Sequence, residues 1–588
     1  MKGVHHKEFL GEVIVQTGTL GIGRNLTCAT PEQNICFQVD QTDNTLEITW
    51  ETTDITTFMD CFDLNTEDCS WFGGPERYEQ LPLEAMHIDP SNPWIVSKVE
   101  GSSIIEPYWL NSKGVYLYVN SITPLTISQN HMHIKRVCFI ANNGGVYAGR
   151  EKVILKYTIG VFENIRAAHL HAVNKFLGKP KDKLSELVTG EPIWSMWDHF
   201  KVARLTEERL LQTGNELQRH GYSGIIDIDD VWENCFGSLE FNKNKFKNVQ
   251  RAVEELRKRK FTVRLWIHPF VNQNCEPTVV TGTREGYFVK DKYGNTSTSW
   301  WFGNYSNQID FTNKKAAKWF TDRLHKIQHE HKIEHFKFDA GEVDYFNNIG
   351  VYPGVNVELV PNVATQKYVE TCSEFRTMSQ VRVGWKTQHL SMLVTMRTKI
   401  SDWGINNGLK GLIATLLQMN INGYTYVLPD IIGGNGSPQK PDAELLVRWT
   451  QVCTFLPAMQ FGYLPWEVKD ELINVNELTK NALKLRRKHY RTILRAVESC
   501  VKTGTPVNPP VWWVEPGNST AYKITDEFLV GEWILVAPVV EKGAIYRDIY
   551  IPTGRWQDGN SECIHIGPKI IKSYSAPIDV LPYFIKIG

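Results

Sequence analysis

The octapeptide His335-Phe-Lys-Phe-Asp-Ala-Gly-Glu342 joins a short apolar run to a pair of acidic residues. Its apolar half is typical of a short buried strand, and this strand ends on the carboxylate of Asp339. In a barrel of parallel strands, catalytic side chains gather at the C-terminal strand ends, where a carboxylate can attack the anomeric carbon of a sugar. Taken alone, the pattern is more typical of an aspartate that caps the following turn. The rest of the chain therefore decides between the two interpretations.

Strand-like runs alternate with amphipathic helical patterns on both sides of this octapeptide. The strand-like runs lie at 192–196, 224–228, 262–267, 335–339, 381–384, 392–396 and 423–428. The helical patterns lie at 206–218, 246–258, 314–331, 365–378, 409–419, 444–455 and 476–498. Roughly eight strands with intervening helices favour a closed β/α barrel over an open doubly wound sheet.

The regions that flank this alternation are rich in short β runs. Residues 1–188 are predicted to form an N-terminal β-sandwich, and residues 505–588 a C-terminal β-sandwich domain. The barrel is predicted to span 189–504, with an insertion near 270–312 that exceeds ordinary loop length and indicates a functional loop or a small subdomain. The predicted fold class is α/β, with a central (β/α)8 TIM-type barrel between two β domains.

The composition narrows the class of partner. Lys plus Arg number 64 and Asp plus Glu number 65, so the net charge is close to zero and does not favour nucleic acid or an anionic membrane as a partner. The glycine-rich stretches 18–23 and 433–436 lack the lysine and the helix of a phosphate-binding loop. No run approaches the ~18 apolar residues of a membrane helix. The 19 Trp residues suit a sugar-binding protein, although large cores also use aromatic residues.

Cysteines and glycosylation sequons favour the secretory pathway or the extracellular space. Cys61 and Cys69 could close a small loop, and so could Cys28 and Cys36. The Asn-x-Ser/Thr acceptors are Asn25, Asn295, Asn304, Asn435 and Asn518. Glu8 and Glu12 interrupt the N-terminal apolar stretch, so no signal peptide is visible there. A cytoplasmic location stays open as the alternative.

Polar residues end several of the predicted strands. The segments that carry them are Ile226-Asp-Ile-Asp-Asp230 with Trp232, Trp266-Ile-His-Pro269, Val381-Arg-Val-Gly384 and Tyr426-Val-Leu-Pro-Asp430. Each alone could be a cap, a turn or a core residue. Because unpaired buried acids are costly, their recurrence at successive strand ends favours one shared site.

These motifs resemble those of family 31 glycoside hydrolases, and most closely an animal branch of that family, the myogenesis-regulating glycosidases. The matching segments are Asp227-Ile-Asp-Asp-Val-Trp232, Trp266-Ile-His-Pro-Phe-Val-Asn272, Phe336-Lys-Phe-Asp-Ala-Gly-Glu342 and Leu428-Pro-Asp-Ile-Ile-Gly-Gly434. The resemblance runs from about Ile193 to the end of the chain.

The resemblance implies a retaining mechanism on α-linked sugars, without a metal or a cofactor. It implies that Asp339 is the nucleophile and that Asp229 and Arg382 contact the sugar. Lys337 would keep the neighbouring carboxylate ionised, because an adjacent cation lowers the pKa of an acid. The predicted substrate-binding residues are Asp229, Asp230, Trp232, Trp266, His268, Trp300, Trp301, Lys337, Arg382 and Asp430.

The general acid is where the chain departs from the family pattern. The family places an aspartate 16 residues after the substrate arginine and five before a tryptophan. Counting from Arg382 and from Trp403 both lead to Thr398, whose hydroxyl is too weak an acid to protonate a glycosidic oxygen. Asp402 could reach the leaving group instead, and we name it as the predicted acid/base. Alternatively, water or Asp430 substitutes poorly, or hydrolysis is lost while sugar binding persists.

The sequence therefore predicts a retaining, exo-acting α-glycosidase of α-glucosidase or α-galactosidase type, with a small carbohydrate as substrate. The alternative is a catalytically impaired or silent carbohydrate-binding or regulatory homologue. Homo-oligomer formation is left open.

Overall fold

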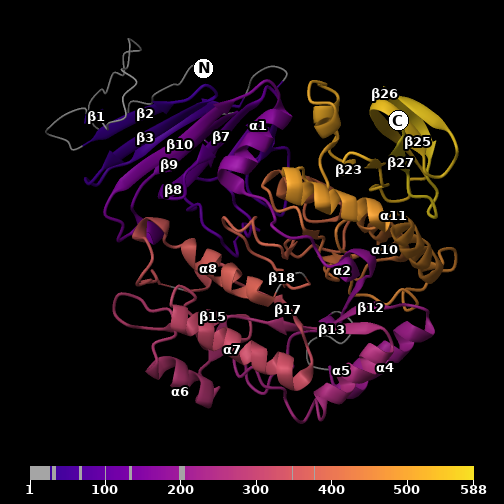
Figure 1. Cartoon of the computed structure of the whole chain (residues 1–588), viewed down its shortest axis with the longest axis horizontal. Coiled ribbons are helices and arrows are strands. Elements are labelled where there is room, and N and C mark those ends of the chain that lie inside the picture. Colours follow the sequence, from indigo (N-terminus) through magenta and orange to yellow (C-terminus); the bar gives the residue numbers. More distant parts are fainter. Residues whose placement is uncertain are drawn as a thin grey trace.

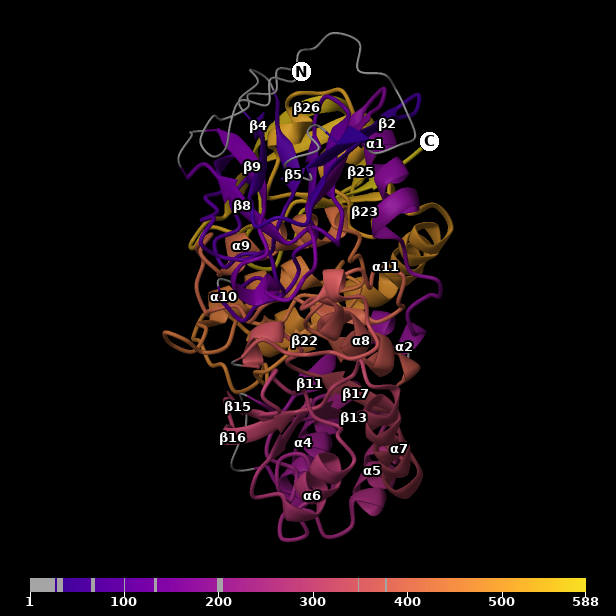
Figure 2. The ribbon, with the colours of Figure 1, turned by 90° about the vertical axis from the view of Figure 1, so that its left-hand side faces the viewer.

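The computed structural model describes residues 27–28, 35–64, 69–99, 101–131, 135–197, 205–346, 348–375 and 378–588. The two β domains lie side by side at one end of the molecule, and the barrel with its helices forms the other end (Figures 1 and 2). The predicted fold class is confirmed. In the part of the chain that the structure describes, no helix is long and apolar enough to cross a membrane.

The barrel is a parallel sheet in which strands occur in the order β20-β19-β18-β17-β13-β12-β11-β22-β21. Its strands are β11 (Ile193–Ser195), β12 (Gly224–Ile228), β13 (Phe261–Ile267), β17 (His335–Phe338), β18 (Gln380–Val381), β19 (Leu393–Thr395), β20 (Val427–Leu428), β21 (Ile431–Ile432) and β22 (Gln460–Phe461). Only Pro429 and Asp430 separate β20 from β21. One barrel strand is therefore broken at Asp430, and its two halves pair with the neighbours on either side, β19 and β22.

Helices cover the outside of the barrel, and their ends follow from capping residues. They are α4 (Glu207–Arg219), α5 (Val249–Lys258), α7 (Lys314–His331), α8 (Val363–Cys372), α9 (Leu409–Ile421), α10 (Ala443–Cys453) and α11 (Val475–Thr503). The side chains of Thr206, Asn248 and Asn313 accept hydrogen bonds from backbone N–H groups in the first turn of α4, α5 and α7. Gly504 ends α11 in the left-handed conformation.

The N-terminal domain is a sandwich of two antiparallel sheets. The larger sheet has the order β1-β2-β3-β10-β7-β6-β5 and the smaller β4-β9-β8. The strands of the larger are β1 (Thr27–Cys28), β2 (Cys36–Gln41), β3 (Thr45–Thr52), β5 (Trp71–Gly73), β6 (Tyr108–Asn111), β7 (Val115–Val119) and β10 (Val153–Val161). Those of the smaller are β4 (Phe58–Asp63), β8 (Leu125–Gln129) and β9 (Arg136–Ala141), and α1 (Ile165–Ala172) and α2 (Glu186–Gly190) lead to the barrel.

The predicted pairing of Cys61 with Cys69 is wrong. Cys61 of β4 is bonded to Cys138 of β9, and Cys69 is free. The two half-cystines are direct neighbours across the strand pair, so strand register rather than closeness in sequence decides the bond. Cys36 is also disulfide-bonded, whereas the side chain of Cys28, its predicted partner, lies outside the described residues.

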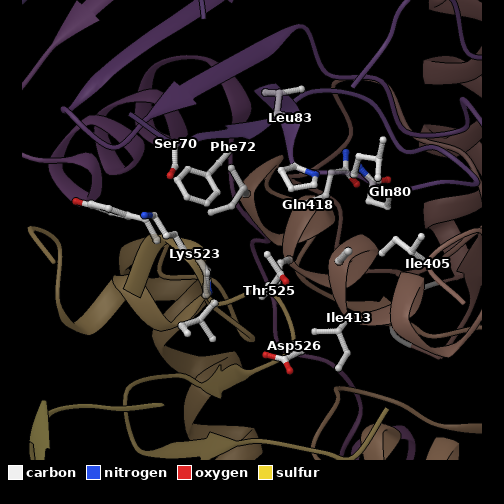
Figure 3. Close-up of a pocket in the computed structure, with 18 of the residues that line it drawn as sticks. Ser70, Phe72, Gln80, Leu83, Ile405, Ile413, Gln418, Lys523, Thr525 and Asp526 are labelled. Carbon is white, nitrogen blue, oxygen red and sulfur yellow. The ribbon is translucent and has the colours of Figure 1, made fainter. Parts of the chain in front are cut away.

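The C-terminal domain is built on one antiparallel sheet in the order β23-β24-β27-β25-β26. Its strands are β23 (Phe528–Val530), β24 (Ile534–Val536), β25 (Tyr546–Asp558), β26 (Ile564–Ser575) and β27 (Tyr583–Lys586). Trp512 and Trp513 share a hydrophobic core with Tyr108 and Tyr116 of the N-terminal domain. A cavity of about 470 Å³ remains where both β domains meet the barrel (Figure 3).

The long insertion predicted near 270–312 is a small subdomain. A three-stranded antiparallel sheet, ordered β14-β16-β15, carries the helix α6 (Glu276–Arg284). Its strands are β14 (Phe270–Asn272), β15 (Ser297–Trp300) and β16 (Gly303–Gln308). The turn between β15 and β16 brings Trp301 and Phe302 to the mouth of the barrel, where both line a cavity.

Candidate active site

A cavity of about 350 Å³ opens at the C-terminal ends of the barrel strands. The predicted site residues that line it are Asp229, Asp230, Trp301, Lys337, Asp339, Arg382 and Asp430, and Thr398 lines it as well. These residues come from five strand ends and from the insertion. Three strand ends also carry a residue with left-handed backbone, namely Asp230 (φ 40°), Ala340 (φ 57°) and Asp430 (φ 52°). Such rarely populated conformations cluster at functional sites.

Asp339 directly follows β17, and its carboxylate is held from two sides. Oδ1 lies 3.2 Å from Nε of Arg382, and Oδ2 accepts a hydrogen bond from Nε1 of Trp266 at 2.8 Å. Burial alone would raise the pKa of Asp339, but the charges of Arg382 and Lys337 outweigh burial and hold that pKa below its usual range. Asp339 is therefore ionised at neutral pH and faces the cavity, as a nucleophile requires.

The next backbone position after Ala340 accepts only glycine. Gly341 has φ 107°, and a Cβ at this position would lie 2.6 Å from the ring of Tyr368 and 2.7 Å from the side chain of Val383. The turn that follows Asp339 thus depends on Gly341 of the octapeptide.

Asp229, which follows β12, and Lys337 of β17 form a buried ion pair past the intervening strand β13. Nζ of Lys337 lies 2.7 Å from Oδ2 of Asp229, which also accepts from Oγ of Ser195 at 3.1 Å. Burial opposes the charge of Lys337, but the surrounding carboxylates raise its pKa, so the ammonium persists. Burial and the charge of Asp229 raise the pKa of Asp230 to about 8, so the carboxyl of Asp230 carries a proton at neutral pH.

A chain of charged groups connects Arg382 to the N-terminal domain. Oε1 of the fully buried Glu342 lies 2.7 Å from Nη2 of Arg382 and 2.9 Å from Nη1 of Arg397. Nη2 of Arg397 donates to the hydroxyl of Tyr78 at 2.9 Å and to the carbonyl of Lys98 at 2.8 Å. The N-terminal domain therefore helps to position the arginine that contacts Asp339.

Glu76 of the same domain holds the segment that carries Thr398. Its Oε1 accepts a hydrogen bond from the backbone N–H of Arg397 at 2.8 Å. Burial raises the pKa of Glu76 to about 7, although the charge of Lys399 acts in the opposite direction. Arg397 and Glu76 were not predicted, and Glu342 was noted as a strand-end acid without a role. The acidic end of the octapeptide was a signal for Glu342, whereas nothing local points to Glu76.

Asp402, the predicted acid/base, does not line the cavity. Its side chain is exposed, and its Oδ2 accepts a hydrogen bond from the N–H of Gly404 at 2.9 Å, which is the geometry of a local turn. Asp430, by contrast, lines the cavity together with Thr398. Its Oδ2 accepts from the N–H of Lys399, next to Thr398, at 2.9 Å, and burial raises its pKa.

Four predicted aromatic or imidazole residues lie behind the cavity wall instead of on it. Nε1 of Trp232 donates to the carbonyl of Trp266, Nε1 of Trp300 donates to Oδ1 of Asn272, and Nε2 of His268 contacts Oε1 of Glu233. Trp266 is fully buried but reaches Asp339 through its indole N–H. The polar atoms of Trp232, Trp300 and His268 thus bond to groups of the protein interior, whereas that of Trp266 positions Asp339. Trp197 and Phe302, which were not predicted, line the cavity, and Trp197 could have been noticed because it follows the first barrel strand.

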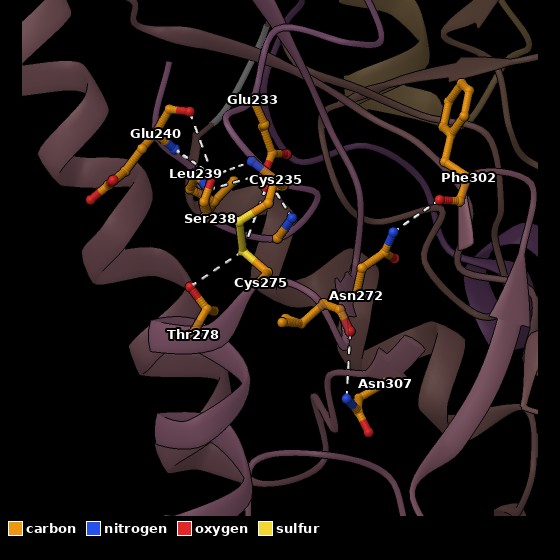
Figure 4. The surroundings of a disulfide bond; sticks show 12 residues. Glu233, Cys235, Ser238, Leu239, Glu240, Asn272, Cys275, Thr278, Phe302 and Asn307 are labelled. Carbon is orange, nitrogen blue, oxygen red and sulfur yellow. Dashed lines mark hydrogen bonds between the residues drawn. A yellow bond between two sulfur atoms is a disulfide. The ribbon is translucent and has the colours of Figure 1, made fainter. Parts of the chain in front are cut away.

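A disulfide bond supports this aromatic wall. Cys235, in the loop after β12, is bonded to Cys275 at the start of α6 (Figure 4). The adjacent Phe236 stacks on Phe302 with ring centroids 4.8 Å apart. The bond therefore fixes the insertion, and with it Phe302, against the barrel. No group of three or more His, Cys, Asp or Glu side chains within the described ranges could hold a metal ion.

A barrel with an ionised carboxylate, an arginine and further carboxyls around one cavity, between two β domains, defines the class of glycoside hydrolases. The family model of the glycosyl hydrolases family 31 TIM-barrel domain matches residues 206–493, and that of the family 31 C-terminal domain matches 504–588. The chain belongs to glycosyl hydrolase family 31, as predicted.

Two relatives and one solved structure illustrate the similarity. The chain is 31% identical to the myogenesis-regulating glycosidase of Mus musculus over 87% of this chain and 74% of that protein. It is 26% identical to the SITS-binding protein of Tetronarce californica over 95% of this chain and 79% of that protein. The structure of a family 31 α-xylosidase from a soil metagenome, complexed with xylose, superposes with a TM-score of 0.77 at 19% identity and covers 97% of this chain and 93% of that one.

Proposed function

We propose that the protein is a retaining, exo-acting α-glycosidase of α-glucosidase or α-galactosidase type, with Asp339 as the nucleophile. The observation that carries the proposal is the ionised carboxylate of Asp339, held between Arg382 and Trp266 and facing the cavity. A cavity of about 350 Å³ suits the terminal unit of a small carbohydrate better than an extended chain. This size favours exo action.

In the first step, an oxygen of Asp339 attacks the anomeric carbon, and the bond from this carbon to the leaving oxygen breaks. The electron pair of that bond passes to the leaving oxygen, which takes up a proton. Because Asp402 does not line the cavity, we assign proton donation to Asp430, whose raised pKa suits an acid beside Thr398. In the second step, water attacks the anomeric carbon and gives a proton to Asp430, while the bond from this carbon to Asp339 breaks and its electron pair restores the Asp339 carboxylate.

One observation favours a second candidate function. Thr398 lines the cavity at the acid position, and Asp430 already accepts the Lys399 N–H. A protein of this kind would bind sugars but turn over alkyl glycosides very slowly, as a carbohydrate-binding or regulatory homologue. Substrates with good leaving groups, such as glycosyl fluorides, would still form the covalent intermediate, because their departure needs no acid.

Intact-mass measurement with 5-fluoro-α-glucosyl and 5-fluoro-α-galactosyl fluoride tests the nucleophile. We expect one covalent adduct on the wild-type protein and none on Asp339→Asn. An adduct that persists in Asp339→Asn, or no adduct on either protein, would remove Asp339 from its role. Calorimetry and turnover with alkyl glycosides then separate the two functions. A silent homologue binds alkyl glycosides in the calorimeter but does not hydrolyse them, whereas the glycosidase does both.

We also propose a secretory or extracellular location. The disulfides Cys61–Cys138 and Cys235–Cys275 support it, because such bonds persist in oxidising compartments. Labelling of free thiols in protein taken from its native cell tests this proposal, and reduced Cys235 and Cys275 would contradict it.

A further inference from the structure

The cavity of about 470 Å³ between the three domains is separate from the barrel site and has a different chemical character. Its walls come from β5 and the turn η1 (Leu83–Ala85) of the N-terminal domain, from α9 of the barrel, and from η8 (Ala521–Lys523) of the C-terminal domain (Figure 3). A volume of this size lies in the range of cavities that bind small organic molecules.

Most of the lining is apolar and includes three aromatic residues, Trp71, Phe72 and Tyr522. Phe72 and Tyr522 have ring centroids 6.3 Å apart and form part of one wall. Leu417 and Ile524 are only partly buried, although each packs against a core cluster. When an apolar body displaces water from half-buried apolar side chains that share one cavity, the free energy of the system falls.

One buried polar atom in the lining has no partner. Gln418 of α9 is 6% exposed, and its Nε2 donates to the carbonyl of Gly74 at 2.8 Å. Within the described part of the chain, its Oε1 is buried and accepts no hydrogen bond. A buried acceptor without a donor is unfavourable, so the Gln418 amide would gain a hydrogen bond by turning Oε1 towards a ligand N–H or O–H in the cavity.

Among the charged side chains that line the cavity, one cation has no carboxylate partner in the described part of the chain. Glu541 forms an ion pair with Lys410, and Asp526 forms one with Arg547. Burial raises the pKa of Glu84, the remaining carboxyl of the lining, which favours its neutral form. Lys523 is exposed at the cavity and pairs with no carboxylate among the described residues.

We propose that this cavity is a second ligand-binding site, which takes an amphipathic organic anion. The flat apolar body of the ligand would lie against Phe72 and Tyr522, a donor N–H or O–H would reach Oε1 of Gln418, and the acidic group would meet Lys523. The proposal does not depend on glycosidase activity, because no residue of the barrel site takes part.

Fluorescence titration of the full chain with 1-anilinonaphthalene-8-sulfonate tests the site, since this probe has a flat body, one N–H and one sulfonate. N-phenyl-1-naphthylamine, which has the same body and N–H without the sulfonate, is the matched uncharged probe. We expect saturable binding of one probe per chain. Ala414→Trp, which fills the cavity from α9, should weaken both probes at least tenfold, and Leu417→Trp serves as a second filling variant if the first fails to fold.

The charged contact is tested by a pair of lysine variants. Lys523→Gln should lower the affinity for the sulfonate probe roughly fivefold, as for the loss of an exposed ion pair, and leave the affinity for the uncharged probe unchanged. Lys569→Gln, at an exposed lysine on β26 of the same domain, should change neither. Sulfonate binding that survives both tryptophan variants, or that falls equally in the two lysine variants, would overturn the proposal. Displacement of the probe by 1-deoxynojirimycin would place it in the barrel cavity and would also overturn it.

Discussion

Replacement of Thr398 by aspartate should accelerate the hydrolysis of alkyl glycosides. Thr398 lines the same cavity as Asp339, at the position where the family has its acid. A positioned acid is worth ~10²–10⁴ in rate, or roughly 3–5 kcal/mol of activation free energy. We therefore expect kcat/KM for an alkyl α-glycoside to rise in Thr398→Asp, by this whole factor if the wild-type protein is the silent homologue and by less if Asp430 already donates the proton.

The local structure supports the role of the new acid and indicates that the fold tolerates the exchange. Asp430, which accepts the N–H of the adjacent Lys399, places a second carboxyl close by. Because two neighbouring carboxyls resist ionising together, the pair keeps one proton towards neutral pH, and the new aspartate can donate it. The side chain of Thr398 is exposed, so the exchange should change the free energy of unfolding by less than about 0.5 kcal/mol.

The assay compares substrates that do and do not need an acid. Glycosyl fluorides should change by less than roughly threefold in Thr398→Asp, because fluoride leaves without protonation. Thr398→Asn has the same shape as the aspartate variant but cannot donate a carboxyl proton, and it should stay at the wild-type rate on alkyl glycosides. Equal rates for the aspartate and asparagine variants, or an equal gain on every substrate, would refute the reasoning.

Three further predictions concern charge and cross-linking. Arg382→Gln should raise the pKa of Asp339 and move the acidic limb of the pH profile of kcat/KM upward by roughly 1–3 units, whereas an unmoved limb would separate Arg382 from the nucleophile. Glu76 has its pKa raised by burial from 4.5 to about 7, so the folded state binds the extra proton and should lose about 3 kcal/mol of stability as pH rises between these values. Thermal unfolding of Glu76→Gln should lack this loss, and a pH dependence identical to that of the wild type would contradict it. The Cys235–Cys275 bond closes a loop with a sequence separation of 40, so the double serine variant should lose about 4 kcal/mol in urea unfolding relative to the oxidised wild type. Under reducing conditions, which also break Cys61–Cys138, the two proteins should unfold at the same urea concentration.

The position of the predicted nucleophile follows from local sequence. An apolar run that ends on Asp339 favours a buried strand, and Gly341 permits the turn after it. The helix predicted at 314–331 is α7, residue for residue, because its asparagine cap and its apolar periodicity both lie within the segment. Such features depend on neighbours within a few positions along the chain.

The surroundings of that nucleophile depend on the tertiary structure. Arg397 donates a hydrogen bond to Tyr78, which lies 319 positions away in the sequence, and strand register brings Cys61 next to Cys138. Asp402 accepts a hydrogen bond from the nearby Gly404 N–H, although it lies only four residues after Thr398, which lines the cavity. Pattern and periodicity specify where a strand ends and which face of it is apolar. Which side chains then converge is decided by how strands align and domains pack, because contacts between distant segments leave no trace in the local order of residues.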